Sequence, residues 1–137
     1  MFCLCQVTFA CDCNSGALYA SLSSADAVVV VTIVSAELVD DPDNLQGRRR
    51  VVGIAEPHRN GTTWGRVKDK IFVTGESPTS TCYRPLNIGE NYILVIHYNR
   101  PIHLSACSAS KRTADYTRNE LETISLLASM RKTERAR

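Results

Sequence analysis

The sequence predicts a small, mostly β domain, a closed barrel of five strands with flanking helices, the C-terminal one packed on it. Five β-branched or alternating segments recur at regular spacing between turn-forming clusters. Near the C-terminus the hydrophobic period changes to that of an amphipathic helix. Six cysteines in 137 residues are also a high count, typical of a chain that folds in an oxidising compartment.

Length and composition narrow the class of protein. A chain of 137 residues can bury one core but not two. The fractions of hydrophobic residues (44%) and charged residues (22%) are those of a folded globular protein. The net charge of +2 is too small to indicate nucleic acid or an acidic membrane as a partner. No apolar run reaches the roughly 20 residues that span a bilayer, and we expect a monomer without a membrane span.

Residues 1–10 are apolar and uncharged, and small residues stand at positions −3 and −1 relative to Cys11. Such residues are typical of a signal-peptidase site. Ten residues without a basic start are too short for a complete signal, so we interpret the segment as the remnant of a signal peptide. The alternative is a first strand that carries Cys3 and Cys5 as buried thiols. Cleavage would give a secreted, extracellular chain that begins at Cys11.

The cleaved chain would keep four cysteines, at positions 11, 13, 82 and 107. Four cysteines allow three pairings. A bridge between Cys11 and Cys13 is strained, because the preferred Cα separation and sulfur torsion are hard to reach in a Cys-X-Cys loop. Two pairings remain open, and both tie segment 11–13 to two remote parts of the chain. We therefore expect a short, rigid segment at the start of the cleaved protein.

Five segments have the β-branched content or the alternation of strands: 27–34, 48–55, 67–74, 91–98 and 102–106. A short helix over 15–24 is expected before them, because leucines recur there at helical spacing. A strong turn cluster, 40–44, separates the first two strands. Asn60-Gly61 predicts a second turn before Trp64, and the tight turn 99–101 joins the last two strands.

The C-terminal part predicts a helix over 118–130. Thr117 and Glu120 fit a capping box, and Tyr116 and Leu121 occupy the positions of a hydrophobic staple. An apolar stripe at helical spacing follows, formed by Leu121, Ile124, Leu127 and Ala128. We expect this stripe to pack on the barrel and the charged tail 131–137 to fray.

No enzyme site is evident. The histidines His58, His97 and His103 have no carboxylate or serine at a spacing typical of a triad, and no zinc-protease or phosphate-loop motif occurs. His97 and His103 are expected to face each other across the last two strands as a structural pair. We therefore expect neither enzymatic activity nor a cofactor.

Three further sequence patterns are weaker indications of a metal, basic or glycosylation site. A zinc site from Cys3, Cys5, Cys11 and Cys13 is the alternative in a reducing compartment, but structural zinc ligands are usually spaced more widely than Cys-X-Cys. The triplet 48–50, all arginine, is read as a solvated strand end rather than a heparin or processing site. Asn60-Gly61-Thr62 is a glycosylation sequon, usable in a secreted chain, which makes Asn60 a candidate site.

Several of these segments together resemble a known family. They are Cys11-Asp12-Cys13, the run 24–30 (SADAVVV), Cys82, the run 87–94 (NIGENYIL) and Cys107. The set resembles the netrin-like (NTR) module and is most similar to the N-terminal domain of the tissue inhibitors of metalloproteinases (TIMP-like). The resemblance covers about residues 11–130, and the cysteine spacing is its specific part.

The resemblance implies a five-stranded OB-fold barrel with disulfides Cys11–Cys82 and Cys13–Cys107. It also implies a metalloprotease inhibitor, in which the α-amino group and carbonyl oxygen of Cys11 chelate the catalytic zinc of the target protease. Asp12 would then enter the S1′ pocket of the enzyme. Cys13 would belong to the same contact segment as Cys11 and Asp12. A second contact segment, tethered through Cys11–Cys82, would be formed by Ser80, Thr81, Cys82 and Tyr83.

Asp12 stands where the inhibitors favour a small hydroxyl residue. A buried carboxylate costs several kcal/mol unless the pocket offers it a partner, so the expected target has a basic or open S1′ pocket. The alternative function is a non-inhibitory NTR binding module that engages extracellular matrix or a secreted partner through surfaces such as the arginine triplet.

Overall fold

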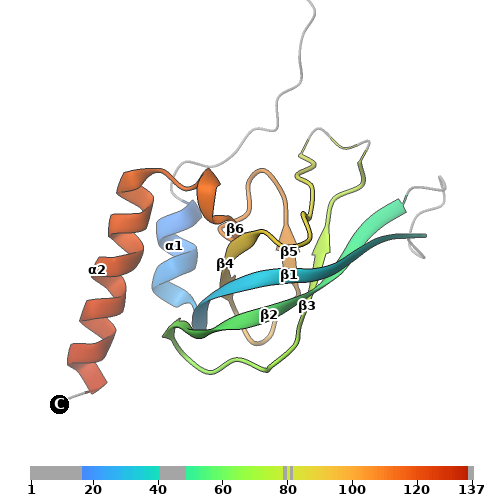
Figure 1. Ribbon diagram of the computed structural model, residues 1–137. Helices are drawn as coiled ribbons and strands as arrows, with labels where there is room; N and C mark the ends of the chain where they lie inside the picture. The colour runs from blue at the N-terminus through green and yellow to red at the C-terminus, as the bar shows by residue number, and fades with distance from the viewer. Residues whose placement is uncertain (1–16, 41–48, 79, 81, 136–137) are drawn as a thin grey trace, which may run out of the picture.

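The computed structural model describes residues 17–40, 49–78, 80 and 82–135. In this part the protein is mostly β, with one curled sheet of six strands and two α-helices beside it (Figure 1). The elements in chain order are α1 (Ala17–Ser24), β1 (Ala27–Asp40), β2 (Arg49–Trp64), β3 (Ile71–Gly75), β4 (Asn91–Ile96), β5 (Ile102–Leu104), β6 (Lys111–Arg112), the 3-10 turn η1 (Thr113–Asp115) and α2 (Arg118–Arg135). The mostly β class and the C-terminal helix are thereby confirmed.

The strand order is β5-β3-β2-β1-β4-β6, so β1 lies at the centre of the sheet. Strand β1 pairs with β2 almost along its whole length and with β4 over its first half, both antiparallel. Strand β3 pairs with β2 antiparallel and with β5 parallel. The short strand β6 pairs with β4 and was not predicted. In the described sheet β4 and β5 are therefore not neighbours.

The tight turn predicted between β4 and β5 is present, since Arg100 N donates to His97 O (3.0 Å). The two strands do not form a hairpin, however. The chain after Ile96 is held by α1 and the start of β1 instead: Tyr98 N donates to Asp26 Oδ2 (2.7 Å). It then returns beside β3 rather than beside β4.

The two faces of β1 pack into two different cores, although the length of the chain predicted a single one. Alternate residues from Ala27 to Ile33 lie in the core enclosed by the curled sheet, together with Val73 and Leu94. Val28, between them, lies in a second core under the helices, with Leu22 of α1 and Ile124 of α2. This alternation is the period of two that a strand imposes. It explains why the β-branched run at the start of β1 has no polar face.

The turn predicted at Asn60-Gly61 is a bulge within β2. A step of two residues along β1, from 29 to 31, matches a step of five along β2, from 62 to 57, so the extra residues bulge out of the ladder. Asn60 adopts a left-handed conformation there (φ 63°). The strand then continues to Trp64, which is buried and donates from Nε1 to Ala25 O (3.3 Å).

Helix α2 begins with the predicted capping box. Thr117 N donates to Glu120 Oε1 (2.9 Å), and Glu120 N donates to Thr117 Oγ1 (3.1 Å). Ile124 and Ala128 of the stripe are buried, whereas Leu121 is exposed.

The prediction that the chain frays from residue 131 is wrong for residues 131–135, because helix α2 continues to Arg135. Arg131 lies over the Trp64 ring (4.7 Å to its centroid) and donates from Nη2 to Ser23 O (3.0 Å). These contacts attach the last turns of α2 to the buried Trp64 and to the end of α1.

Gly65 and Gly89 both have a positive φ, but only Gly65 is closely packed. Substitutions at the two positions therefore distinguish the effect of backbone strain from that of a steric clash. Gly65 (φ 81°) follows β2, and a Cβ atom there would lie 2.3 Å from Asp26 O. Gly89 (φ 87°) has nothing within 4 Å of such an atom. We predict that Gly89→Ala costs about 1 kcal/mol of the free energy of unfolding, from backbone strain alone. Gly65→Ala should cost at least about 3 kcal/mol, because the clash adds to the same strain.

Denaturant unfolding of the two variants tests this difference. Equal losses of stability would mean that the close approach of Gly65 to the start of β1 is not a constraint on the fold.

Candidate protein-docking ridge

Two distant segments that carry cysteines lie side by side. Ala106 N donates to Cys82 O (2.8 Å), which joins the segment after β3 to the segment after β5. Cys82 and Cys107 are both disulfide-bonded. Their expected partners, Cys11 and Cys13, lie outside the described residues together with Asp12 and Thr81, so the pairing stays a prediction. We call segments 80–84 and 105–107 the cysteine ridge.

The first half of the ridge is a tight turn built around Ser80. Ser80 N donates to Ser77 O (2.8 Å) and Tyr83 N donates to Ser80 O (3.1 Å). Cys82 N donates to Ser80 Oγ (3.2 Å). The half-buried Tyr83 side chain packs against the sheet core. Of the predicted contact residues, the structure thus places Ser80, Cys82 and Tyr83 together in one turn.

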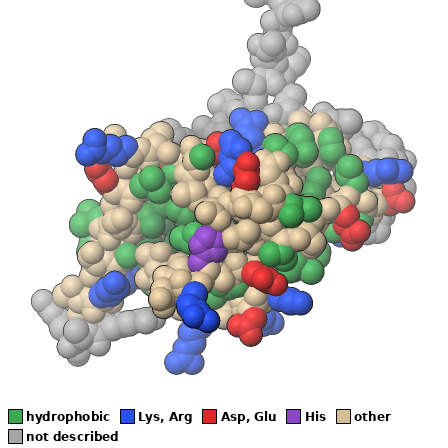
Figure 2. All heavy atoms as spheres, viewed as in Figure 1, with side chains coloured by type: hydrophobic (Ala, Val, Ile, Leu, Met, Phe, Trp, Pro, Cys, Tyr) green, Lys and Arg blue, Asp and Glu red, His purple; other side chains and the backbone are tan. Residues whose placement is uncertain are grey.

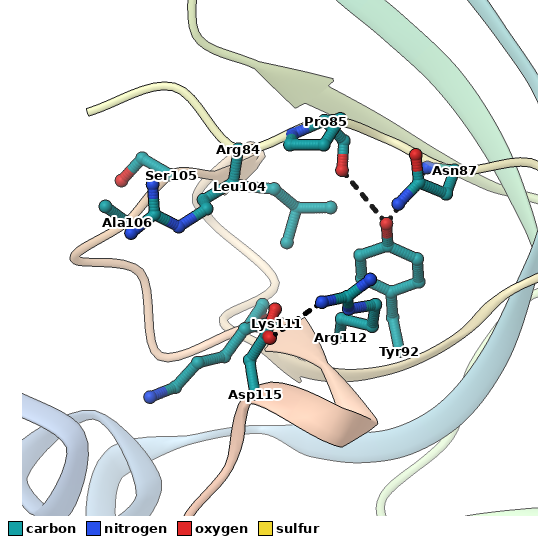
Figure 3. Close-up of a pocket in the computed structure, with 11 residues that line it drawn as sticks. Arg84, Pro85, Asn87, Tyr92, Leu104, Ser105, Ala106, Lys111, Arg112 and Asp115 are labelled. Carbon is teal, nitrogen blue, oxygen red and sulfur yellow. Dashed lines mark hydrogen bonds and ion pairs between the residues drawn. The ribbon is translucent and has the colours of Figure 1, made fainter. Parts of the chain in front are cut away.

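A pocket of about 340 Å³ lies beside the ridge. It is lined by residues from the segments before β4, after β5 and around β6 (Figure 3). The hydroxyl group of Tyr92 donates to Pro85 O (3.0 Å) and accepts from Asn87 N (3.0 Å). Burial raises the pKa of Tyr92, which keeps this hydroxyl protonated as a donor. Tyr92 therefore fixes the chain that leads from the ridge into β4.

Most of the charge at the pocket is internally paired. Arg112 bonds Glu90 Oε2 (3.1 Å) and Asp115 Oδ1 (3.0 Å), and both carboxylates raise its pKa above the usual value. The pKa of Glu90 is held below its ordinary value by the side-chain amide of Asn87 and then by Arg112. Lys111 is paired with Glu120 (3.0 Å).

Arg84 is the exception among these cations. Its side chain is exposed, and its Nη1 donates to Tyr83 O (3.0 Å). Among the described residues it takes part in no ion pair. It therefore presents a positive charge at the edge of the ridge, next to the predicted contact residues. Sequence reasoning missed Arg84, because nothing in the local pattern distinguishes it from other surface arginines.

His97 and His103 both line a pocket of about 160 Å³. The Nε2 atom of His97 lies 3.1 Å from Ser21 O and 3.2 Å from Ser24 Oγ of α1. His103 Nδ1 lies 2.9 Å from Thr74 Oγ1, and its Nε2 lies 3.0 Å from Glu76 Oε1. The parallel pairing of β3 with β5 brings these groups together, and no sequence spacing could show it.

The glycosylation sequon and the arginine triplet both lie at the surface where the structure describes them. Asn60 is exposed on the β2 bulge, so the sequon lies at the surface. Arg49 is exposed and pairs with Asp40 (3.4 Å), as expected of a solvated strand end. Among the described residues no three histidine, cysteine or acidic side chains form a metal cluster, and no helix is long and apolar enough to cross a membrane. The four cysteines of the alternative zinc site lie outside these residues.

Comparison of the chain with protein-family models and with curated proteins finds no match. The candidate site combines a braced turn, a pocket and an exposed arginine beside two disulfide-bonded cysteines.

Removing the Tyr92 hydroxyl should loosen the ridge. We predict that Tyr92→Phe costs about 1 kcal/mol of the free energy of unfolding, because a partly buried carbonyl and a partly buried N–H lose their partner. Tyr19→Phe is the matched control, since Tyr19 is 62% exposed. Amide hydrogen exchange of residues 82–87 should speed up in Tyr92→Phe alone. Unchanged exchange there would show that Tyr92 does not brace the ridge.

The lowered pKa of Glu90 predicts a dependence of stability on pH. A carboxyl group whose pKa is lower in the folded than in the unfolded state stabilises the fold above its unfolded pKa, and this contribution is lost as the pH falls through the folded value. The wild type should therefore lose more stability than Glu90→Gln between about pH 6 and about pH 3. Denaturant titrations of both proteins across this range test the sign. Parallel curves would exclude a role for Glu90.

Proposed function

We propose that the chain is a secreted inhibitor of zinc metalloproteases, with the α-amino group and carbonyl oxygen of Cys11 as ligands of the catalytic zinc of the target. The observation that carries the proposal is the cysteine pattern. Cys-X-Cys at 11–13 is matched by Cys82 and Cys107, both disulfide-bonded, and the segments that carry them are hydrogen-bonded to each other. Bridges from Cys11 and Cys13 to these two positions would hold the zinc-binding segment on the ridge.

The strand pairing supports an OB-fold as the scaffold of this function. OB-folds are five-stranded, partly open Greek-key barrels. Here β1 lies between β2 and β4, and β3 pairs with β5 in parallel. We propose that β1 to β5 are the five barrel strands and that β6 extends the edge of β4.

The proposed mechanism follows from zinc chemistry. Catalytic zinc in proteases keeps a position open for water or substrate. A neutral α-amine, whose unperturbed pKa is about 8, is a good nitrogen ligand for that position. It would displace the water that attacks the substrate. Two disulfides would hold the ligand in place before docking, so that little conformational entropy is lost on binding.

The ridge would supply the second contact with the enzyme. Ser80, Thr81, Cys82 and Tyr83 would lie against the substrate cleft, and Asp12 would enter the S1′ pocket. Arg84 adds a charge that suits an acidic rim of the cleft. Because Asp12 is a carboxylate, the proposal specifies a target with a basic or open S1′ pocket.

The test compares two chains secreted from a eukaryotic host, one beginning at Cys11 and one with a single alanine before it. Intact mass before and after reduction establishes the start of each chain and its disulfides. The first chain should inhibit members of a metalloprotease panel. The extended chain should inhibit at least about 100-fold more weakly, because zinc coordination is worth several kcal/mol.

Asp12→Thr is the companion variant, and it should widen the range of proteases that are inhibited. Equal inhibition by the two chains would overturn chelation by Cys11. Absence of inhibition by both, together with saturable binding to extracellular matrix, would favour the non-inhibitory NTR module instead.

A further inference from the structure

A second concave surface lies at the opposite end of the sheet from the cysteine ridge (Figure 1). It is a groove of about 630 Å³ between loop 65–70, which follows β2, and loop 97–101, which follows β4. Its floor is apolar and includes Ile71, Ile96 and Ile102. Phe72, at the start of β3, is 61% exposed in it. We call this surface the cationic groove, for the charges described below.

The two walls of the groove are bonded to each other. Tyr98 Oη donates to Arg66 O (2.8 Å) and accepts from Arg66 N (3.1 Å). Tyr98 N is in turn held by Asp26 Oδ2 (2.7 Å). His97, which also lines the groove, is held by its contacts with α1. The groove is therefore formed before any ligand arrives, and binding would require little ordering of its walls.

The lining carries positive charge and no carboxylate. Its four cations are Arg66, Lys68, Lys70 and Arg100. None of them forms an ion pair with another residue that the structure describes. Asp69 lies between Lys68 and Lys70 in the sequence, and Asp26 accepts a hydrogen bond from Tyr98 N. Figure 2 shows basic side chains at this lower end of the molecule, with acidic ones beside them.

We propose that the cationic groove binds a single-chain amphiphilic anion, with a hydrocarbon or aromatic body and a carboxylate, sulfate or phosphate head. The volume lies in the range of small-molecule sites, about 300–1,000 Å³. The body would lie on Phe72 and the isoleucines, and the head would pair with Lys70 or Arg100. An extended peptide fits less well, because its backbone groups would find few hydrogen-bonding partners on a floor that is mainly apolar.

The experiment uses calorimetric titration of the full chain with decanoate below its critical micelle concentration, and with decyltrimethylammonium as the cation of equal chain length. Decanoate should bind at one site per chain and the cation at least about tenfold more weakly. Lys70→Glu and Arg100→Glu should each weaken decanoate binding about tenfold. Lys132→Glu is the matched control, an equal charge change on the exposed face of α2.

A second pair of variants tests the apolar floor. Phe72→Ser should weaken binding of decanoate, whereas Leu126→Ser, at an equally exposed position on α2 (62%), should not. Thermal melts of all variants verify that they fold. Equal binding of the cation, or equal effects of groove and control variants, would overturn the proposal.

Experiments with vesicles distinguish the two possible sources of such a ligand, a membrane lipid and a free amphiphile in solution. Vesicles of phosphatidylcholine with and without phosphatidylglycerol replace decanoate in a second arm. Binding that needs phosphatidylglycerol and is lost in Lys70→Glu, without binding of free decanoate, assigns the groove to membrane lipid. Binding of decanoate alone assigns it to a free amphiphile. Binding of neither overturns the proposal.

Discussion

The constraint on which the structure depends is that β1 is buried on both faces. Its odd-numbered residues from Ala27 to Ile33 face the core inside the curled sheet, and Val28 faces the core under the helices. A slip of one residue would exchange the two sets between cores of different shape, so the register is strongly specified. The partners of β1 on either side are then fixed. The loops that follow β2 and β4 form the cationic groove at one end of the sheet, and the segments that follow β3 and β5 form the cysteine ridge at the other (Figure 1).

Local signals predicted those elements whose stability is local. The β-branched run of β1 and the capping box of α2 lie where the sequence indicates, because both depend on neighbours within a few residues. Asn60-Gly61 failed as a turn although its local preference is strong. Burial of Trp64 and the tight packing of Gly65 against the start of β1 keep β2 in the ladder beyond it, and the turn-forming residues are accommodated as a bulge.

The candidate sites also differ in whether a sequence pattern predicts them. Cysteine spacing pointed to the ridge, because a Cys-X-Cys pair needs remote partners. Nothing in the sequence pointed to the pocket around Tyr92, to the exposed charge of Arg84 or to the cationic groove. The pocket and the groove are each assembled from segments tens of residues apart, which only the sheet topology brings together. The position of His103 between Thr74 and Glu76 has the same origin, the parallel pairing of β3 with β5.

The β2 bulge has a consequence for how the chain tolerates changes of length. The pairing with β1 resumes on either side of it, with smaller register shifts between 28 and 29 and between 33 and 35, and the residues between positions 57 and 62 have no paired partner on β1. An insertion or deletion inside them would change the size of the bulge without moving the flanking pairs out of alignment. Strand β2 can thus absorb a change of length near its C-terminal end, while the longer part of its pairing with β1, from residue 49 to 57, keeps its register.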